Sequence, residues 1–354
     1  MGTMIAIAPL DEALTFARAR TQVSPRLLAV LSYAGDRLSC ADISHLVVAP
    51  EEDAIDVFNR LGYDTLRSEI ERAAPIEVAA ADLLMPVRLA DTHIAAGTNY
   101  REHAQEATVK GGPFLFPKLV APTDARAAIP AGDALLDYEV ELCLVPMKPI
   151  GPRDRAAGGL ILGNDVTDRA SLLRHIDPAN PLSGRGFTTG KSAPGYLPVG
   201  DLFVVPRNLA AFVGQVTLEL SVNGERRQHA PAMDWIWDFD EILRQARAKA
   251  KTEWAHRGGV ARLAFTAEGA VPARVLLMAG TPAGTVFQGV ARGDYASGIL
   301  DWLAGFGRRS LVRSVIERHI ARVRAASIYL QPGDEVTIRV DRLGTLANRV
   351  ARQD

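Results

Sequence analysis

Short apolar runs interrupted by glycine and proline characterise the chain from Ile94 onward. The segment Val216–Val222 alternates between apolar and polar residues and is followed at once by Asn223-Gly224. Such alternation is typical of a strand with one buried face, and Asn-Gly is the strongest short signal for a tight hairpin turn. Further strands are expected in four segments: Leu136–Val145, Leu160–Gly163, Val275–Ala279 and Glu335–Val340. The pattern predicts a β-rich region whose strands are joined by turns.

The chain before residue 90 has a different pattern. Apolar residues recur at helical spacing in four segments: Leu10–Arg20, Pro25–Tyr33, Glu51–Arg60 and Asp64–Ala74. Pro75 would end the last of these helices, and one short strand is expected at His45–Val48. We therefore divide the chain into a mostly helical accessory region at 1–90 and a second domain at 91–354. The first region is expected to serve packing or dimer contacts rather than chemistry.

A basic amphipathic helix is predicted at Arg308–Arg324. Its apolar residues fall on one face: Val312, Val315, Ile316, Ile320 and Val323. A basic helix can bind anionic lipid or nucleic acid. We favour instead a solvated arginine face, with the apolar face packed on the body of the protein or on a second subunit. Because the helix follows the Gly280-Thr281-Pro282 loop, it could also shape the mouth of a pocket.

Composition narrows the functional class. The 354 residues include 48% hydrophobic residues and carry a formal net charge of −1. The chain can therefore bury a sizeable core, and neither nucleic acid nor a membrane surface is expected as its main partner. Two cysteines, Cys40 and Cys143, are too few for a disulfide framework and suit a reducing compartment. No stretch reads as a membrane span or a signal peptide, so we expect a cytoplasmic protein.

Two glutamates in one predicted strand suggest a metal site. Glu139 and Glu141 are two residues apart, so on a strand their side chains point to the same face. Carboxylates that close repel each other unless a cation or solvent separates them. Asp165, at the end of the next apolar run, offers a third oxygen ligand. Three carboxylates suit Mg²⁺ or Mn²⁺, and Ca²⁺ less well. The alternative is an acidic pair that faces solvent on an edge strand.

A histidine and a glutamate form a second candidate pair. His103 and Glu106 are three residues apart, so a short helix would place both on one face. The carboxylate could then orient the imidazole as a general base that takes a proton from water. An ordinary surface salt bridge is the alternative for such a pair.

Seven short motifs follow one another between residues 92 and 350: Asn99–Glu106, Asp137–Leu142, Gly163–Arg169, Gly190–Ser192, Val222–Glu225, Gly280–Gly284 and Gln331–Asp334. Their order resembles that of the fumarylacetoacetate hydrolase family. Each segment is a weak signal alone, and together in the family's order they are a strong one. The resemblance implies a mixed β-sandwich roll around the active site, and a homodimer built through this domain.

The resemblance also implies roles for individual residues. Glu139, Glu141 and Asp165 would be the metal ligands, with no organic cofactor. His103 and Glu106 would lie on a lid-like segment and activate a water.

Four further residues match positions around the family's substrate. Lys191 matches the active-site lysine, which would neutralise enolate or oxyanion charge. Gly280 and Thr281 match the loop that presents an amide and a hydroxyl to a substrate carboxylate. Arg169 would hold a carboxylate or orient the metal ligands.

The activity that the resemblance implies is metal-dependent hydrolysis of a C–C bond in a 1,3-diketo or acylpyruvate-type 2-oxo acid. Other reactions of the family stay open: 2-keto-3-deoxy sugar-acid dehydration or hydration, oxaloacetate decarboxylation and 2-oxo-enoate isomerisation. A catalytically silent metal-binding assembly protein is a further alternative. The presence of His103, Glu106 and Lys191 together argues against silence.

The chain departs from the family pattern in three places, one of which is the segment Ala193–Asp201 after the lysine, which lacks the frequent Gly-Pro ending. Where the family has Ser/Thr-Ala-Arg-Asp and then a glutamine, this chain has Thr167-Asp168-Arg169-Ala170 and no glutamine. About forty residues, at roughly 288–327, are inserted between Gly284 and Gln331 and include the predicted basic helix. The acyl group of the substrate is therefore not identified by the sequence.

Overall fold

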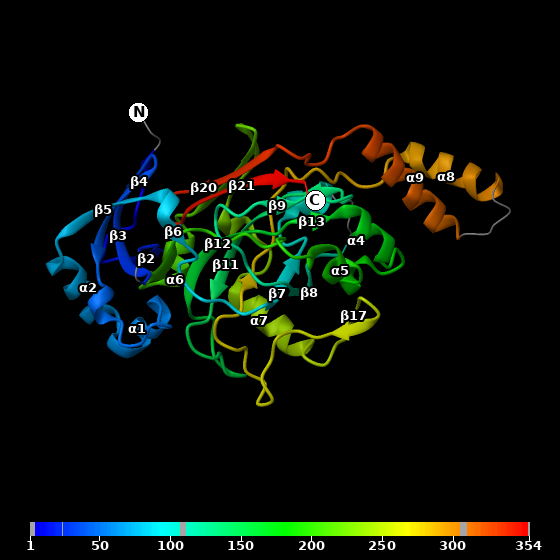
Figure 1. Ribbon diagram of the computed structural model, residues 1–354. Coiled ribbons are helices and arrows are strands. Elements are labelled where there is room, and N and C mark those ends of the chain that lie inside the picture. The colour runs from blue at the N-terminus through cyan, green and yellow to red at the C-terminus, as the bar shows by residue number, and fades with distance from the viewer. Residues whose placement is uncertain (1–3, 23, 107–110, 305–309, 353–354) are drawn as a thin grey trace.

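A 12-stranded sheet is the largest element of the computed structural model, which describes residues 4–22, 24–106, 111–304 and 310–352 (Figure 1). Its main path is β5 (Pro75–Ala79), β4 (Arg37–Asp42), β3 (Arg26–Ala34), β2 (Ala13–Ala19), β14 (Phe203–Pro206), β12 (Gly159–Asn164), β11 (Val140–Val145), β19 (Leu277–Met278), β7 (Thr92–Gly97) and β8 (Phe114–Leu119). The short strands β1 (Met4–Ile5) and β6 (Leu83–Leu84) pair with β3 and β2. Strands β19 and β7 are parallel, while the other pairs of this sheet are antiparallel.

A five-stranded sheet in the described residues packs on the first. Its order is β16 (Glu225–Pro231), β15 (Thr217–Val222), β20 (Glu335–Val340), β21 (Gly344–Ala351) and β9 (Ile129–Pro130). Strand β15 contacts β11, and β21 contacts β12. The predicted hairpin is confirmed, because Asn223 and Gly224 have φ of 51° and 80° between β15 and β16, as a two-residue turn of this kind requires.

Every residue of β11 and β12 is buried. Each has a neighbour on both edges, and the second sheet contacts both of them. Strands covered on both faces appear in sequence as continuous apolar runs rather than as alternation. The predicted strands at Leu160–Gly163 and Glu335–Val340 are confirmed, whereas the one at Val275–Ala279 is shortened to Leu277–Met278.

Short strand pairs and helices complete the described fold. Strand β10 (Leu136–Asp137) pairs with β13 (Thr167–Asp168), and β17 (Trp254–His256) with β18 (Gly259–Ala261). The α-helices are α1 (Ala54–Leu61), α2 (Tyr63–Arg72), α3 (Arg101–Glu106), α4 (Arg169–His175), α5 (Phe187–Lys191), α6 (Leu209–Val213), α7 (Phe239–Ala248), α8 (Arg292–Ala304) and α9 (Leu311–Ala325). Single 3₁₀ turns lie at Ser44–Leu46, Ala80–Asp82, Pro181–Ser183 and Ala232–Asp234. The predicted β-rich α+β fold is confirmed.

The N-terminal region differs from its prediction. Helices α1 and α2 confirm two of the predicted helices. The prediction of helices at Leu10–Arg20 and Pro25–Tyr33 is wrong, because these segments contain strand β2 and most of strand β3. Strand β2 lies between β3 and β14 and is buried at nearly every position, so apolar residues occupy both of its faces. In the sequence such a run lacks strand alternation and can be mistaken for helical spacing. The short strand predicted at His45–Val48 is also wrong, since that segment contains a 3₁₀ turn. The domain boundary near residue 90 stays a prediction.

Helices α8 and α9 form a hairpin that projects from the sheets at the right of Figure 1. The predicted amphipathic helix is confirmed for α9, which buries Val315, Ile316, Ile320 and Val323 but leaves Val312 partly exposed. Its predicted first residues, Arg308 and Arg309, lie outside the described residues. No helix in the described part of the chain is long and apolar enough to cross a membrane.

Candidate active site

Three buried carboxylates meet where β11 and β12 lie side by side. One oxygen each of Glu139, Glu141 and Asp165 lies within 4.8 Å of the others. The predicted single strand at Leu136–Val145 is interrupted, because Glu139 lies in the gap between β10 and β11. The Asp165 amide donates to the Glu139 carbonyl at 2.9 Å. This bond holds the two acidic segments together.

Two lysines neutralise part of this charge. Lys191 Nζ lies 2.9 Å from Glu139 Oε2 and 2.7 Å from Asp165 Oδ2. Lys118, from β8, lies with its Nζ 2.5 Å from Asp165 Oδ1 and also donates to the carbonyls of Lys191 and Tyr196. Burial alone would raise the pKa of Asp165, but the ammonium groups of Lys118 and Lys191 outweigh it and lower that pKa. Asp165 therefore remains an anion.

Of the three carboxylates, Glu141 forms no ion pair with the described residues, whereas Glu139 and Asp165 do. Its Oε2 accepts a hydrogen bond from the Gly280 amide at 3.0 Å. Burial, and then the neighbouring Asp165 and Glu139 carboxylates, raise the pKa of Glu141 well above its usual value. A divalent ion bound by the three carboxylates would remove this repulsion. The donor set, which is oxygen only and buried, fits Mg²⁺ or Mn²⁺.

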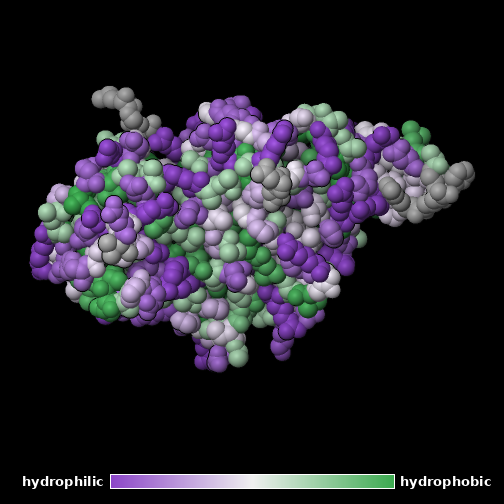
Figure 2. Space-filling model, in the orientation of Figure 1, coloured by the Kyte–Doolittle hydropathy of each residue, from purple (hydrophilic) through white to green (hydrophobic). Residues whose placement is uncertain are grey.

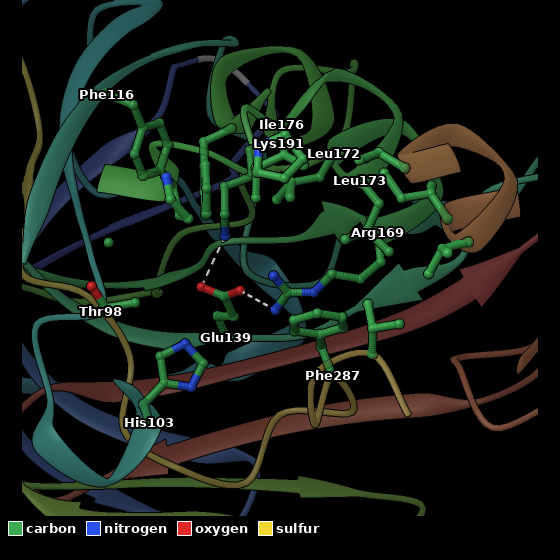
Figure 3. Close-up of a pocket in the computed structure, with 18 of the residues that line it drawn as sticks. Thr98, His103, Phe116, Glu139, Arg169, Leu172, Leu173, Ile176, Lys191 and Phe287 are labelled. Atoms are coloured by element: carbon green, nitrogen blue, oxygen red, sulfur yellow. Dashed lines mark hydrogen bonds and ion pairs between the residues drawn. The ribbon is translucent and has the colours of Figure 1, made fainter. Parts of the chain in front are cut away.

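Arg169 connects the acidic cluster to α4. Its Nε lies 2.8 Å from Asp137 Oδ2 and its second guanidinium nitrogen 2.5 Å from Glu139 Oε1, as Figure 3 shows for Glu139. The guanidinium also lies over the Phe287 ring, 5.5 Å from its centre. Asp168, one of the departures from the family pattern, caps α4 by accepting from the amides of residues 170 and 171. Arg169 thus fixes the orientation of Glu139, and its contact with substrate stays a prediction.

His103 faces the acidic cluster from the other side. Figure 3 shows His103 and Lys191 on opposite sides of the Glu139 carboxylate. His103 lies on α3, as predicted, and its Nδ1 is 3.7 Å from Glu106 Oε2. Both Glu106 carboxylate oxygens accept from the Gly284 amide, at 3.2 and 3.0 Å. Burial would raise the pKa of Glu106, but contacts with His103 and Gly284 lower it, so an anchored anion lies beside the imidazole.

The Gly280-Thr281 loop contacts the acidic cluster at Glu141. Gly280 has φ of 82°, and a Cβ there would lie 2.9 Å from the Ala96 carbonyl oxygen. Its amide binds Glu141, as described above. Thr281 Oγ1 accepts from Gln228 Nε2 at 2.8 Å, and Thr281 is one of the residues that line the cavity. Substrate binding by Gly280 and Thr281 stays a prediction.

The sequence analysis missed three residues of the site. Lys118 is a charged residue inside an otherwise apolar strand, and that contrast was a usable signal. Asp137 accepts from Arg169 and from the amides of Val286 and Phe287, which attaches the loop before α8 to the cluster. Gln228 joins the Val140 amide to the Thr281 loop. No local pattern marks Asp137 or Gln228, because their partners are distant in sequence.

The cluster lies at one end of a cavity of about 360 Å³. The lining includes four charged residues, Glu139, Asp165, Arg169 and Lys191, together with His103. The rest of the wall is largely aliphatic and aromatic: Phe116, Leu172, Leu173, Ile176, Phe187, Phe287, Val290, Tyr295, Ile299, Leu311, Val312, Val315 and Ile316. The structure thus brings the predicted residues His103, Lys191, Glu139, Asp165, Arg169 and Thr281 to one cavity, with Glu141, Glu106 and Gly280 directly behind it.

Comparison with known proteins identifies similar sequences. Residues 92–351 match the family model described as fumarylacetoacetate (FAA) hydrolase C-terminal. An uncharacterized protein of Staphylococcus epidermidis is 26% identical over 281 residues, which cover 77% of this chain and 72% of that protein. An uncharacterized protein of Staphylococcus aureus is 25% identical over 281 residues, with the same coverage.

Solved structures are similar in fold. Fumarylacetoacetate hydrolase from psychrophilic Exiguobacterium antarcticum has a TM-score of 0.61 at 21% identity, covering 96% of this chain and 100% of that chain. Maleylpyruvate hydrolase from Sphingobium sp. SYK-6 has a TM-score of 0.58 at 19% identity, covering 95% and 100%. A probable 2-hydroxyhepta-2,4-diene-1,7-dioate isomerase from Mycobacterium abscessus has a TM-score of 0.59 at 20% identity, covering 96% and 99%.

Proposed function

Because the chain belongs to the fumarylacetoacetate hydrolase family, we propose that it is a metal-dependent hydrolase that cleaves a C–C bond in a 1,3-diketo or acylpyruvate-type 2-oxo acid. The observation that carries this proposal is the arrangement of a three-carboxylate cluster and a histidine beside Glu106 around one cavity. Relatives of similar fold are named as hydrolases of fumarylacetoacetate and maleylpyruvate, which are substrates of this class.

Glu139, Glu141 and Asp165 would hold the ion, Mg²⁺ or Mn²⁺. When bound, such an ion supplies Lewis-acid polarisation of a substrate carbonyl. Lys191 adds a fixed positive charge at the same end of the cavity, because its Nζ contacts Glu139 and Asp165. Negative charge that develops on the keto-acid part of the substrate would be stabilised there without rearrangement of the protein.

His103 is the proposed general base. Glu106 Oε2 lies 3.7 Å from Nδ1, too far for a hydrogen bond in this structure. Closer approach of the carboxylate in the substrate complex would hold the imidazole hydrogen on Nδ1 and leave Nε2 basic. The imidazole takes a proton from water while the water oxygen attacks the carbonyl carbon farther from the carboxylate. The C–C bond then breaks with its electron pair on the 2-oxo acid fragment, which is protonated. The products are a carboxylic acid and a 2-oxo acid such as pyruvate.

A substrate panel tests this proposal. The purified full chain is assayed with Mg²⁺ or Mn²⁺ on acylpyruvates, a 2-keto-3-deoxy sugar acid, oxaloacetate and a 2-oxo-enoate. We expect release of one carboxylic acid and one 2-oxo acid from acylpyruvates, and slower or no reaction with the others. If only the sugar acid, oxaloacetate or the 2-oxo-enoate reacts, the hydrolase proposal is wrong and the protein catalyses the corresponding dehydration, decarboxylation or isomerisation. Absence of any turnover would favour a silent metal-binding protein.

The chain is also proposed to form a homodimer. The exposed apolar residues Met4 and Leu31 of the N-terminal strands β1 and β3 mark a candidate contact surface. Sedimentation velocity of the full chain would test this, and a single monomeric species at micromolar concentration would refute it.

A further inference from the structure

The inserted hairpin forms part of the wall of the candidate active site. Tyr295 and Ile299 from α8, and Leu311, Val312, Val315 and Ile316 from α9, all line the cavity that contains Glu139 and Lys191. The insertion therefore does more than pack on the body of the protein. Its two helices contribute six residues to the wall of the cavity, in addition to those of α4.

The hairpin is fixed to the helix that carries Arg169. Ile316 and Ile320 of α9 pack with Leu173 of α4 in one buried cluster. Arg174 of α4 forms two hydrogen bonds with the carboxylate of Glu317, at 3.0 and 2.9 Å. Because α4 begins at Arg169, the apolar wall is positioned relative to the acidic cluster.

The two helices of the hairpin are also fixed to each other. Asp294 of α8 accepts from Arg322 at 2.7 and 2.9 Å and lies 2.8 Å from His319 Nδ1. Gly298 of α8 approaches Val315 so closely that a Cβ would lie 2.6 Å from the Val315 Cα. These contacts fix the relative positions of the two helices that contribute to the wall.

The chemistry of this wall selects the ligand. Among the cavity-lining residues of the described chain, the cationic side chains at neutral pH are Arg169 and Lys191, and both are paired with protein carboxylates. Among the described residues of the hairpin that line the cavity, none is a cation that could bind a second carboxylate of the substrate. Several wall residues are instead apolar and partly exposed, including Ile299 at 43% and Val312 at 47%. Figure 2 shows a few hydrophobic residues at the surface of the hairpin, at the upper right, among hydrophilic ones.

We infer that α4 and the α8–α9 hairpin form a binding subsite for an apolar acyl group. The substrate is then an acylpyruvate-type 2-oxo acid with an extended aliphatic or aryl tail, rather than a short or dicarboxylic one. The keto-acid part lies at the acidic cluster and the tail lies along the hairpin. This inference rests on the proposed function for the reaction, but the subsite itself can be measured by binding.

The first experiment measures binding without turnover. Calorimetry in Mg²⁺ compares pyruvate, 2-oxooctanoate and 2-oxoglutarate, which lack the second carbonyl needed for cleavage. We expect 2-oxooctanoate to bind most tightly, with a gain of up to about fourfold in affinity per buried methylene. We expect 2-oxoglutarate to bind no better than pyruvate. Equal binding of all three, or a preference for 2-oxoglutarate, would overturn the inference.

A matched pair of variants then locates the tail. Ile299→Asp places a charge in the cavity wall, and Leu300→Asp places the same charge on the next residue of α8, which is 66% exposed and does not line the cavity. We expect Ile299→Asp to reduce the ratio of 2-oxooctanoate to pyruvate affinity about tenfold or more, and Leu300→Asp to leave that ratio unchanged. Circular dichroism and thermal unfolding would confirm that both variants fold.

The outcomes separate this inference from the proposed function. If no acylpyruvate is cleaved but 2-oxooctanoate still binds through Ile299, the subsite stands and the hydrolase proposal fails. If acylpyruvates are cleaved at rates independent of tail length, the hydrolase stands and the subsite fails. If both variants dissociate a dimer and neither changes the affinity ratio, the apolar hairpin face is a subunit contact, and the inference is overturned.

Discussion

Lys118 Nζ lies 2.5 Å from Asp165 Oδ1, and both side chains are almost completely buried. The pair joins β8 at one edge of the large sheet to the end of β12 in its centre. A buried ion pair contributes little compared with an apolar pair of the same shape, but the loss of one partner leaves an uncompensated charge. The position of the proposed metal ligand Asp165 therefore depends on a lysine from a distant strand.

Replacement of this lysine should destabilise the fold. We expect Lys118→Met to lower the free energy of unfolding by about 3 kcal/mol, because the buried Asp165 carboxylate loses one of its two ion pairs. The remaining ion pair, with Lys191, limits the loss. Urea denaturation monitored by tryptophan fluorescence would measure the change. Lys148→Met, at an exposed position, is the control and should have no effect. Equal stability of Lys118→Met and the wild type would show that the pair is dispensable.

Replacement of Glu141 should separate metal binding from stability. Glu141→Gln removes a charge that is buried beside Asp165 and Glu139, while the amide oxygen can still accept from Gly280. We expect Mn²⁺ affinity, measured by calorimetry, to fall about tenfold or more, and the melting temperature of the metal-free protein to stay equal or rise. Glu225→Gln, on the exposed β16, is the control. Unchanged Mn²⁺ affinity in Glu141→Gln would place the ion elsewhere.

Removal of the proposed base should affect turnover more than binding. We expect His103→Ala to lower kcat on acylpyruvates by about 100-fold or more. The affinity for pyruvate in Mg²⁺ should stay close to that of the wild type, because the charged groups at that end of the cavity are Glu139, Lys191 and Arg169. Steady-state kinetics and calorimetry would check the two parts. Full turnover by His103→Ala would exclude the imidazole as the base.

Two glycines of α8 offer a matched test of the hairpin. A Cβ on Gly298 would lie 2.6 Å from the Val315 Cα, whereas a Cβ on Gly293 would meet nothing within 4 Å. We expect Gly298→Ala to destabilise the protein by about 1–3 kcal/mol through overpacking, while Gly293→Ala leaves the stability unchanged or raises it slightly. Thermal unfolding of both variants would measure this. An identical response of the two glycines would mean that the hairpin adjusts freely.

The hairpin should also weaken at low pH. Hydrogen bonds from Arg322 and the contact with His319 together lower the pKa of Asp294 to about 2. Burial acts in the opposite direction but is outweighed. Because this folded-state pKa lies below the usual aspartate value, the stabilisation is complete above about pH 4 and is lost as pH falls toward 2. We expect Asp294→Asn to cost about 2 kcal/mol at pH 6 and much less near pH 2. Denaturation over this pH range, with the exposed Asp301→Asn as control, would test it. A cost independent of pH would refute the assignment.

The candidate site was partly predictable because its residues follow recognisable local patterns. Glu139 and Glu141 lie at strand spacing, Asp165 ends an apolar run, and His103 and Glu106 have helical spacing. The structure brings the three carboxylates together and places His103 opposite Lys191. The strand break at Tyr138–Glu139 was not predictable, because the bond that holds it comes from Asp165 on the neighbouring segment.

By itself, the sequence determined the β-rich class, the hairpin at Asn223-Gly224, the amphipathic α9 and the order of motifs that marks the family. These features depend on residues close together along the chain, where periodicity and turn chemistry act directly. Only the tertiary structure decided that β2 and β3 are strands, that Lys118 compensates Asp165, and that the insertion lines the cavity. A local sequence pattern can indicate that a residue is buried. Which residues cover it, or neutralise its charge, depends on packing between segments that are distant in the sequence.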